Sequence, residues 1–420
     1  MGSPDTDTSA VSPAQARALQ SQPAVPIPVA NPRSADYGPD VTINGKPVSE
    51  TPRRLQYELT ATARATFDDN VFNSSIQKTS DFYFTIEPNI HVWLGSGDTE
   101  GSNSLSLTYA PGVFLFADNS QLDTVQHLIR LLGAHAFGHL SLSLSQDVRL
   151  LDGTDLNSLA DPNGHQANTD VSGRTKHQIY TTQLSGSYDL TGKLYLSADG
   201  NFFADEYSSS LISSRNFGGD VFLNYRYSDK LVVGAGGTGG YNTVSGGDGG
   251  DQTFEQANLR IGYSATAKIS ISGSVGVEFR QFSGISGTNV DPVYTLSANY
   301  TPFDGTGFSL TGSKQTYNSA SLAGQDYSDT TINLAFTQRF LQRFFVGLAV
   351  GYTNSSYFST TTGINATRDD NFYYIDPSID FNITRYWSAG VYYVHRENSS
   401  SLQFFGFNDD QVGFRTRLTF

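Results

Sequence analysis

Residues 409–420 read DDQVGFRTRLTF. Their side chains divide into two alternating sets, an apolar one with Val412, Phe414, Leu418 and Phe420 and a polar one with Gln411, Arg415 and Arg417. Successive side chains of a strand point to opposite faces, so this alternation predicts a strand with one apolar and one charged face. Strands of an outer-membrane barrel have this pattern, because one face meets lipid and the other meets the lumen.

The aromatic residue at position 420 is a second indication. The stretch resembles the C-terminal strand by which the barrel-assembly machinery recognises outer-membrane proteins, a strand that characteristically ends in Phe. The resemblance implies an assembly signal made of Phe420, Leu418, Phe414 and Val412. It also implies that the barrel-assembly machinery is a partner.

The same period of two recurs from residue 53 onward. Residues 140–149, LSLSLSQDVR, place leucines on one face and serines, Asp147 and Arg149 on the other. Comparable alternation is found in residues 55–67, 82–94, 216–227, 269–280, 331–340 and 372–383. Counting the weaker segments as well gives about 18 strands, an even number as in bacterial barrels. We therefore predict an all-β fold, a transmembrane antiparallel up-and-down β-barrel.

The composition agrees with a barrel and argues against several other classes of protein. The 420 residues include no cysteine, so disulfides and cysteine-based metal sites are ruled out. No run of eighteen apolar residues occurs, which argues against a membrane-spanning helix. The mean hydropathy of −0.32 still suits a barrel, because half of each spanning strand faces water. A formal charge of −14 argues against nucleic acid as a partner.

The predicted connections alternate between short and long, which predicts the orientation of the barrel. Short turns are expected near residues 136–138, 191–193, 228–230, 265–267, 302–305, 341–343 and 384–386. Long loops are expected at residues 68–80, 152–175, 205–213, 242–253, 283–291, 318–328, 354–370 and 396–408. Short turns belong to the periplasmic side and long loops to the cell surface, so both termini of the barrel chain are expected in the periplasm, as an even number of strands requires.

Residues 1–52 differ in composition from the rest, being rich in Pro, Ala, Ser and Asp. We expect a disordered periplasmic segment here and a barrel over residues 53–420. The opening residues lack the basic start and hydrophobic core of a secretory signal, so we expect a mature form with an added Met. The segment is a candidate contact for a periplasmic export partner, although its composition favours a simple periplasmic tail or spacer.

Strand parity assigns a set of charged residues to the lumen. The predicted pore-lining residues are Arg64, Glu87, His91, Arg130, Arg149, Arg226, Arg260, Glu278, Arg280, Arg339, Asp376, Asp380, Arg415 and Arg417. Such a mixed lining suits a water-filled passage, because charged side chains bias which solutes pass. The alternative is that these groups pair across neighbouring strands and stiffen the wall.

The longest predicted loop, residues 152–175, leaves two possibilities open. A barrel of sixteen to eighteen strands holds an aqueous channel unless something fills it. The loop reads DGTDLNSLADPNGHQANTDVSGRT and could fold inward as a constriction or stand outside at the cell surface.

No motif predicts a catalytic, metal or cofactor site. Residues 246–251, GGDGGD, match part of a calcium-binding repeat, but such repeats work by stacking and this one is alone. The acidic pairs Asp68-Asp69, Asp369-Asp370 and Asp409-Asp410 could bind divalent cations that bridge lipopolysaccharide, and solvated loop ends are the more common role for such pairs. HExxH and GxSxG are absent, and a lipid-modifying Ser–His pair at His127 is the only enzymatic alternative.

The segment FDDNVF at residues 67–72, followed by a run of hairpins and a final Phe, resembles the β-barrel porin 2 family. The resemblance covers residues 53–420 and implies an outer-membrane pore of the kind associated with exopolysaccharide loci. It transfers no individual functional residue to this sequence.

These observations predict a porin-like channel in the outer membrane of a Gram-negative bacterium, in contact with membrane lipid and lipopolysaccharide. Its solutes are expected to be hydrophilic, with saccharides or an exported polysaccharide as candidates. The alternatives are a closed structural or adhesive barrel, a component of an exopolysaccharide export complex, and a lipid-modifying enzyme.

Overall fold

The computed structural model describes residues 55–95, 103–155, 167–208, 210–245, 251–366 and 368–420. The predicted disordered segment, residues 1–52, and most of the GGDGGD motif lie outside these ranges. The helical segments among the described residues are two 3-10 turns, η2 (Ser120–Leu122) and η3 (Gln403–Phe405). In the described part of the chain, no helix has the length and apolar character needed to cross a membrane.

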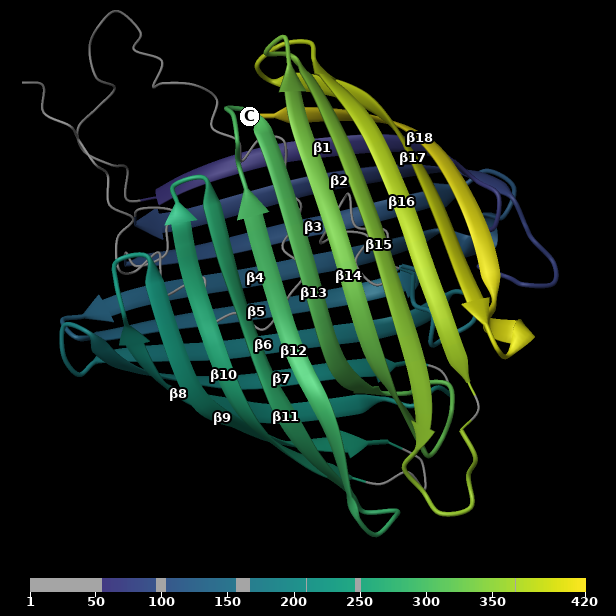
Figure 1. The fold of residues 1–420 in the computed structure, drawn as a ribbon. Coiled ribbons are helices and arrows are strands. Elements are labelled where there is room, and N and C mark those ends of the chain that lie inside the picture. Colours follow the sequence, from purple (N-terminus) through teal and green to yellow (C-terminus); the bar gives the residue numbers. More distant parts are fainter. Residues whose placement is uncertain (1–54, 96–102, 156–166, 209, 246–250, 367) are drawn as a thin grey trace, which may run out of the picture.

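Eighteen antiparallel strands form one closed barrel (Figure 1). Each strand pairs with its neighbours in the sequence, and β1 pairs with β18 to close the ring. The predicted up-and-down barrel is therefore confirmed. The strands are β1 (Leu55–Asp68), β2 (Asp81–Gly95), β3 (Ser104–Phe116), β4 (Thr124–Phe137), β5 (Leu140–Gly153), β6 (Thr175–Asp189), β7 (Leu194–Tyr207), β8 (Ser214–Arg226), β9 (Leu231–Val244), β10 (Gln252–Thr266), β11 (Ile269–Phe282), β12 (Thr288–Tyr300), β13 (Thr306–Asn318), β14 (Gln325–Phe340), β15 (Phe344–Ser359), β16 (Asp369–Asn382), β17 (Trp387–Ser400) and β18 (Phe407–Thr419).

The alternation in residues 409–420 separates the outer wall from the interior as expected. Phe414 is 50% exposed on β18, whereas Gln411 on the opposite face is 2% exposed. The outer face carries most of the exposed large apolar side chains, and the inner face carries most of the buried polar ones. A closed barrel satisfies every backbone group between neighbouring strands, so it can place this apolar wall in lipid. The protein is therefore an outer-membrane barrel.

The first and last strands, β1 and β18, pair along the seam that closes the barrel. Ala61 lies opposite Leu418, and Phe67 lies opposite Val412. The ladder extends to the last residue, because the backbone N–H of Phe420 donates to the carbonyl of Leu59 at 2.8 Å. The predicted assembly signal therefore lies on a strand that pairs on both sides, and its side chains face outward.

The two ends of the barrel differ as predicted. Turns at residues 138–139, 190–193, 227–230, 267–268, 301–305, 341–343 and 383–386 share one end with the start of β1 and the end of β18. By the usual rule this is the periplasmic end. The predicted long loops at residues 68–80 and 152–175 are correct to within two residues, whereas the others were predicted too long, because the strands continue into segments that carry no alternation. The connections span only residues 283–287, 319–324, 360–368 and 401–406, and the prediction missed the connection at residues 117–123.

Polar contacts explain why the strands continue beyond the apolar wall. Near the outer ends of the strands, tyrosine hydroxyls on the outer face donate to carboxylates on the neighbouring segment. These pairs are Tyr241 with Asp251, Tyr373 with Glu397 and Tyr393 with Asp410. Water replaces lipid at this level, so the backbone ladder can continue without an apolar face.

Candidate functional site: the barrel interior and its constriction

The described part of the connection between β5 (ending at Gly153) and β6 (beginning at Thr175) enters the barrel. Its described residues are 154–155 and 167–174, and Asp155 pairs with Ala167 in an isolated bridge. Ala167, Asp170 and Val171 are buried, which a loop standing in solvent would not allow. Of the two possibilities left open by the sequence, the structure shows the inward one.

The loop reaches the opposite wall. In Figure 1, β5 and β6 lie on the far side of the barrel, and β14, β15 and β16 lie on the near side. Asp170 accepts hydrogen bonds from the Ser319 hydroxyl at 2.8 Å, the Ala320 backbone N–H at 2.6 Å and the Tyr357 hydroxyl at 2.9 Å. Ser319 and Ala320 belong to the β13–β14 connection and Tyr357 to β15, so the loop crosses the lumen.

Arg368 fixes the returning leg of the loop. Its side chain is fully buried, forms an ion pair with Asp370 and donates to the backbone carbonyls of Thr169 and Asp170. The guanidinium also lies 3.5 Å from the ring centroid of Phe405. The plane of the guanidinium allows hydrogen bonding at its edge and stacking on its face, which a lysine could not combine.

Arg396 fixes the outgoing leg. Its guanidinium on β17 pairs with Asp155 of the loop and with Asp409 of β18, and its side chain is also fully buried. Two buried arginines therefore hold the two legs of the same loop. A buried arginine with carboxylate partners on both sides is costly to disturb, because removing it leaves unpaired charges.

Burial raises the pKa of the Asp170 carboxyl above its ordinary value, although Arg368 and the hydrogen bonds from Ser319, Ala320 and Tyr357 act in the opposite direction. The docked loop therefore holds a proton on Asp170 more tightly than a solvated loop would.

The packing of the interior differs from one part of the wall to another. On β1 the inner-face residues Thr62 to Asp68 are buried, whereas Glu58 near the periplasmic end is exposed, and β16 shows the same gradient. On β7 and β8, by contrast, Tyr195 and Asn224 are buried near the periplasmic end. The constriction formed by the loop lies in the outer half of the barrel, where Arg368 and Arg396 hold it.

The predicted pore-lining residues lie on the inner face, and most have polar partners there. Ion pairs join Arg64 to Glu87, Arg130 and Arg149 to Asp147, Arg226 to Asp189, Arg280 to Glu278, Arg339 to Asp304 and Arg415 to Asp380. Hydrogen bonds join His91 to Thr108, Arg260 to Asn224 and Arg417 to Thr62. Asp376 is buried on the same face. The pairing supports a stiff wall, and contact of these residues with a passing solute stays a prediction.

Apart from Arg396, which strand parity assigned to the lumen, the residues that hold the constriction were not predicted to face it. Asp155, Asp170 and Arg368 lie in connections, where strand parity assigns no face. Arg368 is 199 positions from Thr169 and 198 from Asp170 in the sequence, so no local pattern links these residues. Only Arg396 and Asp409 lie in strands, where parity places them on the inner face.

His127, the histidine predicted for a lipid-modifying Ser–His pair, contacts a tyrosine. His127 lies on the outer face of β4, and its Nδ1 is 3.0 Å from the hydroxyl of Tyr109. The enzymatic alternative therefore gains no geometric support from His127.

No family model matches the sequence, and no curated protein matches it. Membership of the β-barrel porin 2 family is therefore not confirmed.

Solved barrels are similar at low identity. The crystal structure of OpdK from Pseudomonas aeruginosa with vanillate shares 10% identity, covers 87% of this chain and 99% of its own, and gives a TM-score of 0.40. OccK2 (OpdF) from the same organism, in complex with glucuronate, shares 12% identity over 87% of this chain and 98% of its own, at a TM-score of 0.42. OccAB4 from Acinetobacter baumannii shares 10% identity, covers 87% of this chain and 98% of its own, and gives a TM-score of 0.43. Similarity at this level says nothing about what this chain transports.

Proposed function

We propose that this protein is a channel through which small hydrophilic solutes cross the outer membrane, narrowed by the loop at residues 154–174. The observation that carries the proposal is the polar interior of a closed eighteen-stranded barrel, crossed by a loop that two buried arginines hold. A barrel of this size leaves an aqueous passage unless it is filled. One crossing loop narrows such a passage.

The chemistry of the interior favours uncharged or zwitterionic solutes over simple ions. Its arginines face carboxylates, so the wall presents both charges close together. Tyrosine hydroxyls and amides add neutral hydrogen-bonding groups, among them Tyr374, whose hydroxyl lies 3.3 Å from the side chain of Asn333. Saccharides present hydroxyl groups and apolar ring faces, which suit a wall of amides and aromatic rings. We therefore place small saccharides first among the candidate solutes.

A closed structural barrel is the second candidate, because the outer half is densely packed around Arg368 and Arg396. Passage of a polysaccharide chain is less well supported, since a polymer would have to displace the anchored loop. Export would also need a periplasmic partner, for which residues 1–52 remain the candidate contact. Deleting residues 1–50 should then abolish export in cells and leave the conductance of the purified channel unchanged.

Conductance of the purified full chain in a planar lipid bilayer, under a salt gradient, tests the channel. We expect steady channels for the natural protein and a larger or less steady conductance for Arg368→Ala, because the loop loses its anchor. Glu397→Gln is the matched control, since Glu397 lies on the outer face of β17 next to Arg396. Folded protein that stays silent, both as the natural chain and as Arg368→Ala, would contradict the channel and favour the closed barrel.

A further inference from the structure

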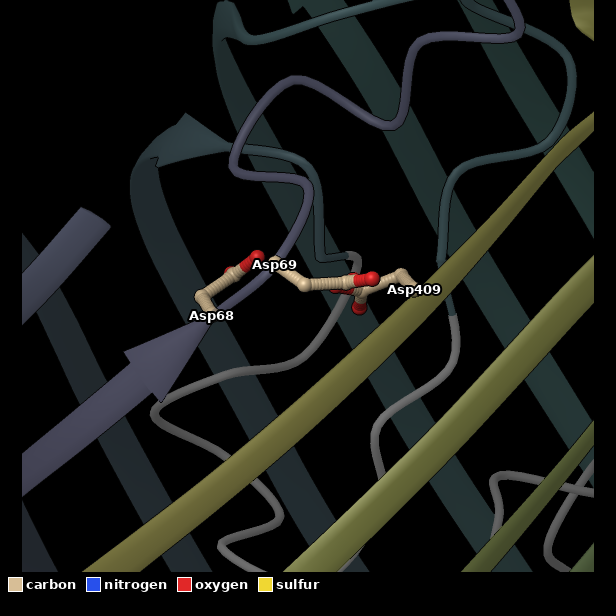
Figure 2. Close-up of side chains that lie close together, drawn as sticks. All are labelled: Asp68, Asp69 and Asp409. Carbon is tan, nitrogen blue, oxygen red and sulfur yellow. The ribbon is translucent and has the colours of Figure 1, made fainter. Parts of the chain in front are cut away.

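Three aspartates meet at the outer end of the seam between β1 and β18. Asp68 ends β1, Asp69 follows it, and Asp409 lies near the start of β18. One carboxylate oxygen of each lies within 4.8 Å of the others. Figure 2 shows the carboxylates of Asp69 and Asp409 extending toward one another, with Asp68 beside them. Asp68 is 4% exposed and Asp409 is 0% exposed, so these are not the solvated loop ends that acidic pairs usually form.

The backbone holds the cluster in place. The N–H of Asp69 donates to the carbonyl of Asp410 at 3.1 Å, and the N–H of Asp410 donates to the Asp69 carboxylate at 2.7 Å. Asn70 adds a side-chain bond to the carbonyl of Asn408 at 2.8 Å. These hydrogen bonds join residues 67–70 (FDDN) to residues 408–411 (NDDQ). The position of the carboxylates therefore does not depend on flexible side chains alone.

One oxygen of this cluster has no donor. Asp68 accepts hydrogen bonds from the Asn70 N–H at 2.7 Å and the Gln411 amide at 3.1 Å. Asp409 accepts from Arg396 and Gln411, all at its Oδ2 atom. Its Oδ1 atom is buried and has no hydrogen-bond partner among the described residues. A buried carboxylate oxygen without a donor is destabilising unless a cation or a proton satisfies it.

The local charge is also unbalanced. Asp68, Asp155 and Asp409 all interact with the single guanidinium of Arg396. Lys78 pairs with Asp69 at 2.7 Å, but its side chain is 39% exposed, so this cation is not buried with the cluster. Three carboxylates therefore face one buried cation, an excess of negative charge where water is scarce. Closely spaced buried carboxylates repel one another strongly in such surroundings.

We propose that Asp68, Asp69 and Asp409 bind a calcium ion at the outer end of the β1–β18 seam. The donors are hard carboxylate oxygens, the ligands that Ca²⁺ and Mg²⁺ prefer. Ca²⁺ is favoured because it accepts irregular geometry, whereas Mg²⁺ demands a near-ideal octahedron. The ion joins the first and last strands and, through Asp409 and Arg396, steadies the outgoing leg of the constriction loop.

Calcium binding by the full chain, purified in detergent free of lipopolysaccharide, tests this proposal. After treatment with EDTA, CaCl₂ alone is titrated by calorimetry, and the unfolding temperature is followed by heat-modifiable gel mobility. We expect one Ca²⁺ per chain and a higher unfolding temperature with Ca²⁺. Asp68→Asn should weaken binding roughly tenfold or more, because fewer charged ligands lower calcium affinity.

The variants are chosen so that folding and binding can be separated. Asp68→Asn keeps an oxygen for the Asn70 N–H and leaves Arg396 with both of its ion pairs. Asp220→Asn is the matched control, because Asp220 lies opposite Asp199 on β7 and β8, and among the described residues no third carboxylate, histidine or cysteine completes a metal-binding group there. It should bind Ca²⁺ as the natural chain does.

Two results would overturn the proposal. One is a natural chain that shows no heat of binding and no thermal response to Ca²⁺. The other is an Asp68→Asn chain that binds as tightly as the natural one. Stabilisation by acid alone, with no effect of Ca²⁺, would mean that Asp68 and Asp409 share a proton instead.

Discussion

At the residue scale, Arg368 and Arg396 hold the loop that forms the constriction. The alternation of polar and apolar residues gave no reason to single out either arginine. Parity placed Arg396 on the inner face but gave no reason to prefer it over the other inner-face arginines. Arg368 lies in a connection and has no parity at all. What distinguishes both is complete burial beside residues distant in sequence, such as Asp155, which is 241 positions from Arg396. Tertiary structure alone brings these partners together.

Replacing Arg396 by Met tests how much this anchor contributes. Asp155 and Asp409 would lose their shared partner, and an uncompensated buried charge costs about 3–5 kcal/mol. We expect the urea midpoint of unfolding in detergent, measured in EDTA, to fall accordingly. Glu397→Gln, on the same strand but on the outer face, should leave the midpoint nearly unchanged. Equal midpoints for both variants would argue against an anchoring role for Arg396.

The raised pKa of Asp170 predicts that the loop responds to pH. The Asp170 carboxyl binds a proton more tightly in the docked loop than in the undocked loop. Protonated Asp170 therefore favours docking at pH values below its pKa in the undocked loop. This contribution to docking is lost as the pH rises through the higher pKa of Asp170 in the docked loop. Arg368 and Tyr357 contact Asp170, and Asp326 and Asp329 on β14 interact with it, so all four belong to the response.

Single-channel noise measured across neutral and acidic pH checks this response. We expect steadier currents in acid for the natural protein and a weaker dependence on pH for Asp170→Asn, whose side chain carries no charge to lose. If the channel noise of Asp170→Asn depended on pH in the same way as that of the natural protein, the pH response would come from groups other than Asp170.

At the element scale, the number and direction of the strands followed from the sequence, and their outer ends did not. Alternation marks a strand only where one face meets lipid. β17 ends in residues 396–400, RENSS, and β18 begins with residues 407–408, FN, all of which lie in the predicted loop at residues 396–408. The two segments nevertheless pair, with Glu397 opposite Asn408 and Asn398 opposite Phe407. Backbone pairing needs no apolar residues, so this part of the ladder left no signal in the sequence.

The β14–β15 turn contains a strained backbone that a substitution can relieve. Leu341 and Gln342 have φ values of 47° and 61°, and Arg343 closes the turn on the carbonyl of Phe340. Glycine adopts this left-handed conformation without steric cost, whereas a residue with a Cβ adopts it at a cost of about 1–2 kcal/mol. Gln342→Gly should therefore stabilise the barrel by roughly 0.5–1 kcal/mol. The urea midpoint measures the gain, and Gln342→Ala, which keeps the Cβ, should show none.

At the scale of the whole molecule, closure of the ring depends on the final strand. Phe420 faces outward and is also bonded to Leu59 through the backbone. Phe420→Ala keeps both backbone bonds and removes only the aromatic ring. We expect it to reduce the heat-modifiable, folded fraction in cell membranes while refolding in detergent stays normal. Equal loss in both settings would mean that the ring contributes to stability, and the predicted assembly signal would be wrong.

The anchored loop has a consequence for the order in which the molecule is built. Its legs leave β5 and return to β6, but the arginines that hold them come from β17 and the segment before β16. The anchors follow the loop residues that they hold by 198 positions for Arg368 and 241 for Arg396. The loop therefore cannot dock until the C-terminal strands are in place, so narrowing of the passage and closure of the barrel depend on the same part of the chain.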